Sequence, residues 1–203
     1  MAKETVVLTG ATDFIEASVL QLLLQRNYNV RVVVRNLTEQ KTLLSNANLK
    51  GIENATFILV PDLLAPNALD AVVAGSQYII HLASSIIDID AEHDHDHETV
   101  VVPATQATLR VLEAAETSGT VKRVVIMSSA AAIVPPNEIL ANDDPPVNRF
   151  VAVSANDRVA DIQPPYDSVS EAFCASKIAA LNASDEFMHR QKRDFDVVNI
   201  MPS

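Results

Sequence analysis

Glycine is scarce in this chain of 203 residues, which contains four glycines, one cysteine and no tryptophan. The single cysteine, Cys174, excludes a disulfide bond within the chain. No apolar run approaches the roughly 20 residues that cross a bilayer as a helix. The first residues lead directly into an apolar strand, so we expect no signal peptide, no membrane partner and a cytoplasmic location.

Basic residues are also few. The chain contains 15 Lys and Arg residues and 26 Asp and Glu residues, so its net charge is −11. A nucleic-acid-binding surface needs a basic face, so we expect no nucleic acid as a partner. Hydrophobic residues make up 48% of the chain. That content predicts one well-buried domain over residues 1–203.

Short apolar runs rich in β-branched residues alternate with amphipathic patterns along the chain. We expect strands at 5–9, 29–35, 56–60, 78–82, 124–127 and 196–201, and helices over 14–26, 66–74, 98–117 and 168–190. Gly119 is typical of a cap that ends the third of these helices. The alternation predicts an α/β, three-layer, Rossmann-like fold with a doubly wound parallel sheet in the order 3-2-1-4-5-6. In such sheets the ligand lies beyond the carboxyl ends of the strands.

One segment, residues 133–166, does not follow the alternation. Its three proline pairs, which are Pro135–Pro136, Pro145–Pro146 and Pro164–Pro165, oppose both helix and central strand. We expect a long loop that leaves the carboxyl end of the fifth strand and covers a site. The alternative is a surface excursion with no site beneath it.

The first predicted strand leads into the turn Thr9-Gly10-Ala11-Thr12-Asp13-Phe14-Ile15-Glu16. In a dinucleotide-binding turn of the form G-x-x-G-x-x-G, the first glycine makes the tight turn, the second admits the pyrophosphate and the third allows close packing of helix on strand. Only Gly10 is present here, because Asp13 and Glu16 occupy the other two positions. The same two residues fit a helix cap, with an Asx residue followed by Glu three residues later.

Several motifs together resemble the extended short-chain dehydrogenases/reductases of the NAD-dependent epimerase/dehydratase superfamily. The resemblance is to the dihydroflavonol reductase and cinnamoyl-CoA reductase branch, with a fungal character, and it covers essentially the whole chain. The motifs that carry it are the turn at 9–16, Arg35, Asp62-Leu63, His81-Leu82-Ala83-Ser84, residues 101–109, Ser128-Ser129, Phe173-Cys174-Ala175-Ser176-Lys177 and residues 198–202.

The resemblance implies an NADP(H)-dependent reductase of a small ketone or aldehyde, of the kind found in fungal secondary metabolism. It implies that Ser129 and Lys177 are catalytic, with Phe173 at the position where the family has its tyrosine. The implied cofactor-binding residues are Gly10, Thr12, Phe14, Ile15, Arg35, Asp62, Leu63, Ala83 and Lys177. Relatives continue beyond the sixth strand, so we expect most of the C-terminal substrate-binding portion to be missing. Helices 98–117 and 168–190 commonly pair in this family, so a homodimer is expected.

Two departures from the family pattern affect the expected function. A carboxylate about 4 Å from a phosphate costs roughly 4 kcal/mol at an effective dielectric constant of 20. We therefore interpret Asp13 and Glu16 as filling the phosphate site, which weakens or abolishes cofactor binding; in the alternative, Asp13 points outward and the cofactor binds. Phe173 cannot donate a proton, and the candidate replacements are Tyr166 and a water relay through Ser170.

The remaining motifs have structural alternatives. Arg35 suits the 2′-phosphate of NADP or is an exposed strand end, and Ser129 is either catalytic or a turn cap. Without the tyrosine, Lys177 is alternatively a solvated or ion-paired lysine, and Cys174 is a packing residue. The segment 93–97, His-Asp-His-Asp-His, favours a polar helix entry over a zinc site, so no metal is predicted.

Three functions stay open from the sequence. The first is the carbonyl reductase, and the second is a cofactor-independent isomerase, cyclase or dehydratase on the same fold. The third is a non-catalytic binding protein. The missing tyrosine and the acidic turn favour the last two, whereas the ordered motifs favour the first.

Overall fold

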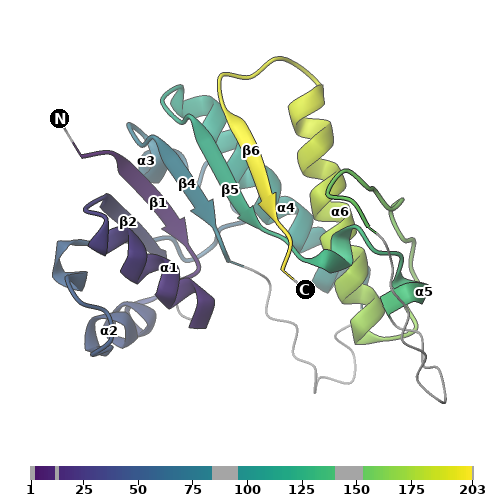
Figure 1. Cartoon of the computed structure of the whole chain (residues 1–203), viewed down its shortest axis with the longest axis horizontal. Coiled ribbons are helices and arrows are strands. Elements are labelled where there is room, and N and C mark those ends of the chain that lie inside the picture. The colour runs from purple at the N-terminus through teal and green to yellow at the C-terminus, as the bar shows by residue number, and fades with distance from the viewer. Residues whose placement is uncertain (1–2, 12–13, 84–95, 140–152, 203) are drawn as a thin grey trace.

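A computed structural model of the chain shows six parallel strands in one sheet (Figure 1). The structure describes residues 3–11, 14–83, 96–139 and 153–202. The strands are β1 (Thr5–Thr9), β2 (Asn29–Val34), β3 (Thr56–Leu59), β4 (Tyr78–His81), β5 (Arg123–Met127) and β6 (Asp196–Ile200). Their order, β3-β2-β1-β4-β5-β6, confirms the predicted doubly wound topology.

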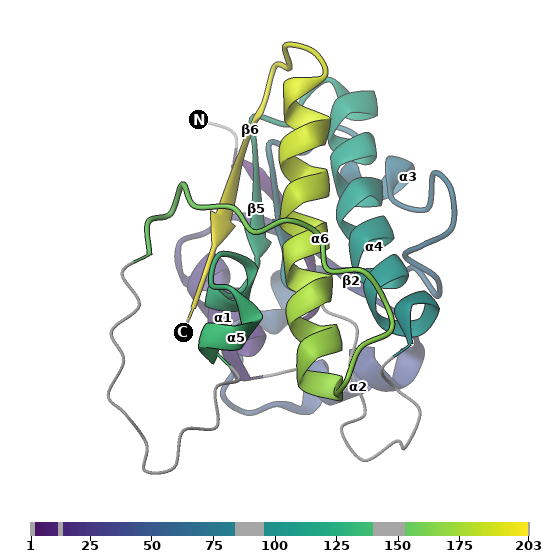
Figure 2. The ribbon, with the colours of Figure 1, turned by 90° about the vertical axis from the view of Figure 1, so that its right-hand side faces the viewer.

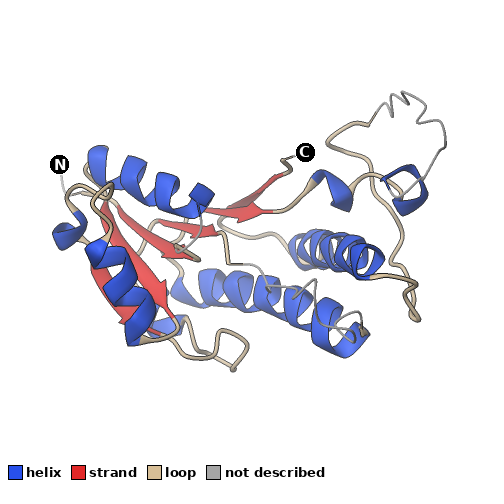
Figure 3. Cartoon of the chain, turned by 90° about the horizontal axis from the view of Figure 1, so that it is seen from below, coloured by secondary structure: helices blue, strands red, loops and turns tan. Residues whose placement is uncertain are grey.

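Helices cover both faces of the sheet and give the three predicted layers (Figure 3). One face packs against α1 (Phe14–Gln25) and α2 (Leu37–Ser45), and the other packs against α3 (Asp70–Val73), α4 (His97–Ser118) and α6 (Val169–His189). The two hydrophobic clusters share the central strands because alternate residues of a strand point to opposite faces. Thus Val6 and Leu8 face α1, whereas Val7 faces α4. Within the described part of the chain, no helix is long and apolar enough to cross a membrane.

Two short elements and one helix differ from the sequence prediction. Helix α2 was not predicted, because its apolar residues are few; its signal is the cap, in which Asn36 Oδ1 accepts a hydrogen bond of 2.9 Å from the Glu39 amide. The predicted loop 133–166 contains the short helix α5 (Pro136–Ile139) near its start, where a proline at the first helical position is tolerated. The helix expected over 66–74 is reduced to α3.

The later part of that predicted loop, residues 153–166, crosses the outer face of α6, and we call it the strap (Figure 2). Arg158 of the strap forms an ion pair with Asp185 of α6. Asn182 of α6 donates hydrogen bonds to the Val159 carbonyl (2.9 Å) and to Asp161 Oδ1 (2.7 Å). Polar contacts therefore hold the strap against the helix.

The carboxyl ends of β1 and β4 approach each other closely. The Thr9 carbonyl accepts hydrogen bonds from the amides of Leu82 (3.0 Å) and Ala83 (3.1 Å). Gly10, the next residue, has φ of +70°, and a Cβ atom there would lie 2.5 Å from the Ala83 nitrogen. A side chain at position 10 therefore meets both backbone strain and a backbone clash.

We predict that Gly10→Ala lowers the free energy of unfolding by more than about 3 kcal/mol, because strain and overlap with the Ala83 backbone add. Gly75→Ala is the matched control, since Gly75 has φ of +72° and a Cβ atom there would meet no other atom within 4 Å. The control is expected to lose only about 1 to 2 kcal/mol. Urea unfolding of both variants measures the difference, and equal losses would contradict the proposed clash.

Candidate active site

Four residues expected to bind the cofactor lie at one edge of the sheet. Gly10, Arg35 and Ala83 follow the carboxyl ends of β1, β2 and β4, and Asp62 follows β3 by three residues. The strands are parallel, so all four positions are at the same edge. Thr12 and Asp13 lie outside the described residues.

The first turn of α1 points a helix N-terminus toward this edge and carries one acidic residue. Phe14 begins the helix, Ile15 is 49% exposed and Glu16 is half-buried. A helix N-terminus offers amide groups and a positive dipole end to an anion. Glu16 places a carboxylate in that first turn, where a bound phosphate would meet a like charge.

Arg35 is held by the cap of α2. Its Nε donates to Glu39 Oε1 at 2.7 Å, and its backbone amide donates to Glu39 Oε2 at 2.8 Å. The arginine side chain remains 56% exposed. The guanidinium is therefore oriented at the edge of the sheet, with Glu39 offsetting part of its charge.

Asp62 and Leu63 form the turn after β3. Asp62 is exposed, and its Oδ1 accepts a hydrogen bond of 2.8 Å from the Leu64 amide. Leu63 packs against the cluster beneath α3 and α4. This turn is ordered by its own side chain, as Asx turns are, and it presents a carboxylate to the same edge as Arg35.

A small pocket lies where β4, β5 and β6 meet α4 and α6, with a cavity volume of about 30 Å³. Its lining includes Lys177, which the sequence motifs selected, and four polar residues that they did not assign to the site. These four are His81, Thr108, Ser128 and Asn199. They come from β4, α4, the end of β5 and β6, so no local pattern in the sequence connects them.

His81 is the deepest titratable group in this pocket, with 4% of its surface exposed. Its Nδ1 pairs with Thr9 Oγ1 at 2.7 Å, which joins the ends of β1 and β4 through side chains as well as backbone. Burial lowers the pKa of His81 to about 4, and the nearby charge of Lys177 contributes in the same direction. The imidazole is therefore neutral at physiological pH.

Lys177 enters the pocket from α6, one helical turn after Phe173. Its Nζ lies 5.4 Å from the centre of the Phe173 ring, within the range of a cation–π contact. Burial lowers the pKa of the Lys177 amine. The spacing therefore places beside this amine an apolar ring that has no ionisable proton.

Ser129 acts as a cap in this structure. It is the N-cap of the 3-10 turn η2 (Ala130–Ala132), and its Oγ accepts a hydrogen bond of 3.2 Å from the Ala131 amide. Its neighbour Ser128 is the serine that lines the pocket with Lys177. Which of the two serines lines the pocket depends on the backbone geometry at the end of β5. The sequence Ser128-Ser129 alone does not reveal that geometry.

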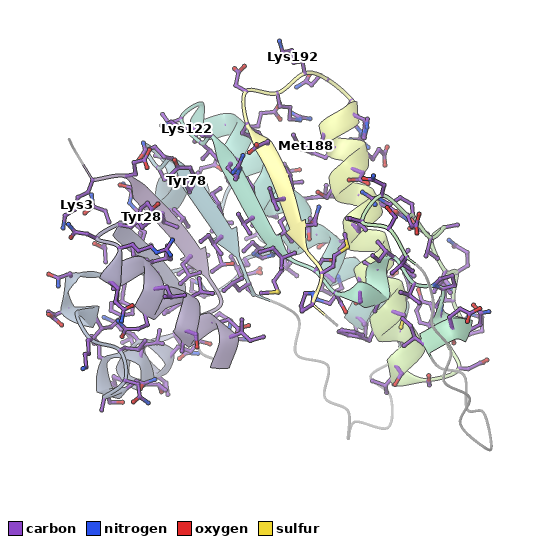
Figure 4. All side chains as sticks on the ribbon, in the orientation of Figure 1. Lys3, Tyr28, Tyr78, Lys122, Met188 and Lys192 are labelled. Carbon is purple, nitrogen blue, oxygen red and sulfur yellow. The ribbon has the colours of Figure 1, made fainter. Side chains whose placement is uncertain are left out.

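None of the three tyrosines lines the pocket. Tyr28 and Tyr78 stack edge to face at the opposite end of the sheet, where Tyr78 donates to Glu4 Oε1 at 3.1 Å (Figure 4). Tyr166, a candidate from the sequence, packs on Ala172 and Ala175, and its hydroxyl lies 2.7 Å from His97 Nδ1.

The face of α6 that contacts Tyr166 is not the face that enters the pocket. At 100° per residue, Ala172 and Ala175 lie roughly opposite Phe173 and Lys177 around the helix. Tyr166 is therefore a packing residue between the strap and the starts of α4 and α6. Ser170, the other candidate donor, is exposed at the start of α6.

The remaining sequence candidates have structural roles where they are described. Cys174 is buried, and burial raises the pKa of its thiol, so it packs in the core. His97 begins α4 and pairs with Tyr166, whereas His93 and His95 lie outside the described residues. The described residues contain no group of three potential metal ligands.

Comparison with known proteins agrees with this arrangement. The sequence profile described as the NAD dependent epimerase/dehydratase family matches residues 6–203. The chain belongs to this family. It is 35% identical over 208 residues to ketoreductase CTB6 of Cercospora nicotianae, and 34% identical over 216 residues to the NAD-dependent epimerase/dehydratase FUM13 of Gibberella moniliformis. These matches cover 100% and 99% of the chain.

Among solved structures, the Gre2 protein of Candida albicans in complex with NADPH is 26% identical and superposes with a TM-score of 0.77 over 98% of the chain. The chain spans 57% of the length of that structure and 57% of the length of both curated relatives.

Acid is expected to destabilise the fold through His81. The pKa of His81 is about 4 in the folded protein and about 6.5 when unfolded, so the unfolded chain takes up a proton first as the pH falls below 6.5. We predict that the free energy of unfolding is about 2 kcal/mol lower at pH 5 than at pH 7 from this residue alone.

Urea unfolding at both pH values measures this effect. His81→Gln keeps a hydrogen-bonding side chain that does not titrate, and it should lose most of the difference between pH 7 and pH 5. His189→Gln, at an exposed histidine of α6, should retain it. Equal pH responses in the wild type and in His81→Gln would rule out His81 as the source.

Proposed function

We propose that the chain is the Rossmann-like, dinucleotide-binding domain of an NADP(H)-type carbonyl reductase that acts on a small ketone or aldehyde. The observation that carries the proposal is that Gly10, Arg35, Asp62, Ala83 and Lys177 share one end of the sheet. The ketoreductase names of the fungal relatives support the substrate class and a place in secondary metabolism. NADPH in the Gre2 complex supports the cofactor.

The described residues fit the adenosine half of the cofactor better than the pyrophosphate half. Arg35 would hold the 2′-phosphate and Asp62 with Leu63 would border the adenine, while the backbone at Gly10 and Ala83 would contact the middle of the molecule. Glu16, in the first turn of α1, opposes the pyrophosphate by roughly 4 kcal/mol at about 4 Å. We therefore propose that binding is weakened but keeps a preference for the 2′-phosphate.

The residues that we propose as catalytic can bind a carbonyl group, but Phe173 offers no proton to complete its reduction. When bound, the nicotinamide would supply hydride to a carbonyl carbon. Ser129 or Ser128 would hold the carbonyl oxygen by hydrogen bonding, and Lys177 would position the ligand and favour negative charge on that oxygen. Phe173 cannot deliver the proton that completes the alcohol, so we propose that reduction is slow in this chain.

A second function rests on the same phenylalanine. A cofactor-independent isomerase, cyclase or dehydratase, or a non-catalytic binding protein, needs neither the phenolic hydroxyl nor an open phosphate site. None of the three tyrosines lines the pocket, which favours this alternative over a reductase that uses a relocated tyrosine. A homodimer through α4 and α6 remains a prediction; the strap covers part of α6 and would be included in such an interface.

We predict that Asp13→Asn combined with Glu16→Gln tightens NADPH binding at least about tenfold, since removing even half of the repulsion exceeds about 1.4 kcal/mol. Fluorescence titration of NADPH measures the dissociation constant. Glu53→Gln combined with Glu138→Gln is the matched control, because it makes the same change in net charge away from the turn. Micromolar binding by the wild type, or equal gains in both double variants, would contradict a self-filled phosphate site.

We predict that Phe173→Tyr creates or raises NADPH-dependent reduction of small ketones by about 10² to 10⁴-fold, because it restores a general acid beside Lys177. Consumption of NADPH with a panel of ketones and aldehydes measures the gain. Ser170→Tyr adds a tyrosine one turn away at an exposed position and should give no gain. If Phe173→Tyr binds NADPH but reduces nothing, the reductase assignment is wrong.

A further inference from the structure

Glu39 is joined to Arg35 by two hydrogen bonds at the carboxyl end of β2. Its Oε1 accepts a hydrogen bond of 2.7 Å from Arg35 Nε, and its Oε2 accepts one of 2.8 Å from the Arg35 backbone amide. The Glu39 amide in turn donates to Asn36 Oδ1 at 2.9 Å. The cap that begins α2 therefore also places a carboxylate against the arginine that we propose as the partner of the 2′-phosphate.

The two partners differ in their exposure. The Glu39 side chain is 16% exposed, whereas the Arg35 side chain is 56% exposed. Because water reaches the carboxylate poorly, its charge is screened less than that of an ordinary surface residue. Within the described part of the chain, the guanidinium contacts Glu39 through Nε, and no hydrogen bond engages its two terminal nitrogens. A phosphate can therefore reach those nitrogens, but it approaches the charge of Glu39 when it does so.

We propose that Glu39 is a specificity-determining residue that limits the preference of this site for nucleotides with a 2′-phosphate. The proposal rests on the proposed function, in which Arg35 meets that phosphate. The Glu39 carboxylate offsets part of the guanidinium charge and repels a phosphate on the other side of it, whereas a free 2′-hydroxyl carries no charge to repel. The site therefore accepts adenine nucleotides of both kinds, with a smaller preference for the phosphate than Arg35 alone would give.

A purely structural role for Glu39 makes the opposite prediction. Glutamine has one acceptor oxygen, so Glu39→Gln can accept only one of the two Arg35 N–H groups and weakens the start of α2. If Glu39 only orders Arg35, binding of the phosphate should weaken together with the stability of the domain. If its charge limits binding, the phosphate should bind more tightly although the domain is less stable. The sign of the change in affinity separates the two roles.

Titration of the intact chain with 2′-AMP and with adenosine tests the proposal. The two ligands differ only in the 2′-phosphate, and neither carries a 5′-phosphate that would approach Glu16. Nuclear magnetic resonance, read at the Arg35 Nε–H signal, gives both dissociation constants. At low salt we expect Glu39→Gln to tighten 2′-AMP binding at least about threefold and to leave adenosine binding unchanged. The gain should shrink at about 0.5 M salt, because ions screen the repulsion.

Asn36→Ala is the matched control, because it removes the other half of the α2 cap and leaves the Glu39 charge in place. Urea unfolding should show a loss of stability in both variants, but Asn36→Ala should not tighten 2′-AMP binding. Unchanged or weaker 2′-AMP binding by Glu39→Gln, or an equal gain in Asn36→Ala, overturns the proposal and leaves the proposed function standing. If the wild type and both variants bind neither ligand, the dinucleotide-binding function is wrong as well.

Discussion

The close backbone approach of Gly10 to Ala83 is the constraint on which the rest of the structure depends. It brings the ends of the two central strands, β1 and β4, within hydrogen-bonding distance through the Thr9 carbonyl. The side chains of Thr9 and His81, the last residues of these two strands, also pair with each other. The turn that leads to α1 starts from this point, so the position of the helix N-terminus follows from a contact that only glycine permits. Gly10 is therefore explained by the fold alone, whether or not a ligand binds at the turn.

The electrostatics of the pocket follow from what surrounds two basic side chains. His81 and Lys177 line one cavity, and burial lowers the pKa of both. Phe173 gives the Lys177 amine an aromatic ring as its neighbour, without the hydroxyl that a tyrosine would add.

Sequence reasoning reached the topology because it depends on patterns that are local. Each strand is a short β-branched run, each long helix is periodic, and the order of a doubly wound sheet follows from their alternation. Helix α2 was missed because a cap, Asn36 with Glu39, defines it better than its apolar residues do. The turn at Asp62, the arginine at the end of β2 and Lys177 were also found from local motifs.

The pocket was only partly predictable, for a physical reason. Thr108, Ser128 and Asn199 belong to three elements that meet through the packing of α4 and α6 on the sheet, and no residue in one segment specifies its partners in the others. The ion pair of Arg35 with Glu39 and the cap at Ser129 likewise depend on side-chain geometry. Sequence identifies such residues as polar groups at strand ends, but three-dimensional packing decides which of them share a cavity.

The strap has a consequence for how the molecule opens. It is bound to the outer face of α6 through Arg158 and Asn182, while the inner face of the same helix carries Lys177 into the pocket. A local unfolding event that separates α6 from the sheet must also release these contacts or move the strap with the helix. The amides of α6 and of the strap should therefore exchange with solvent deuterium as one cooperative unit. Access to the interior of the pocket is in this way coupled to a segment on the far side of the helix.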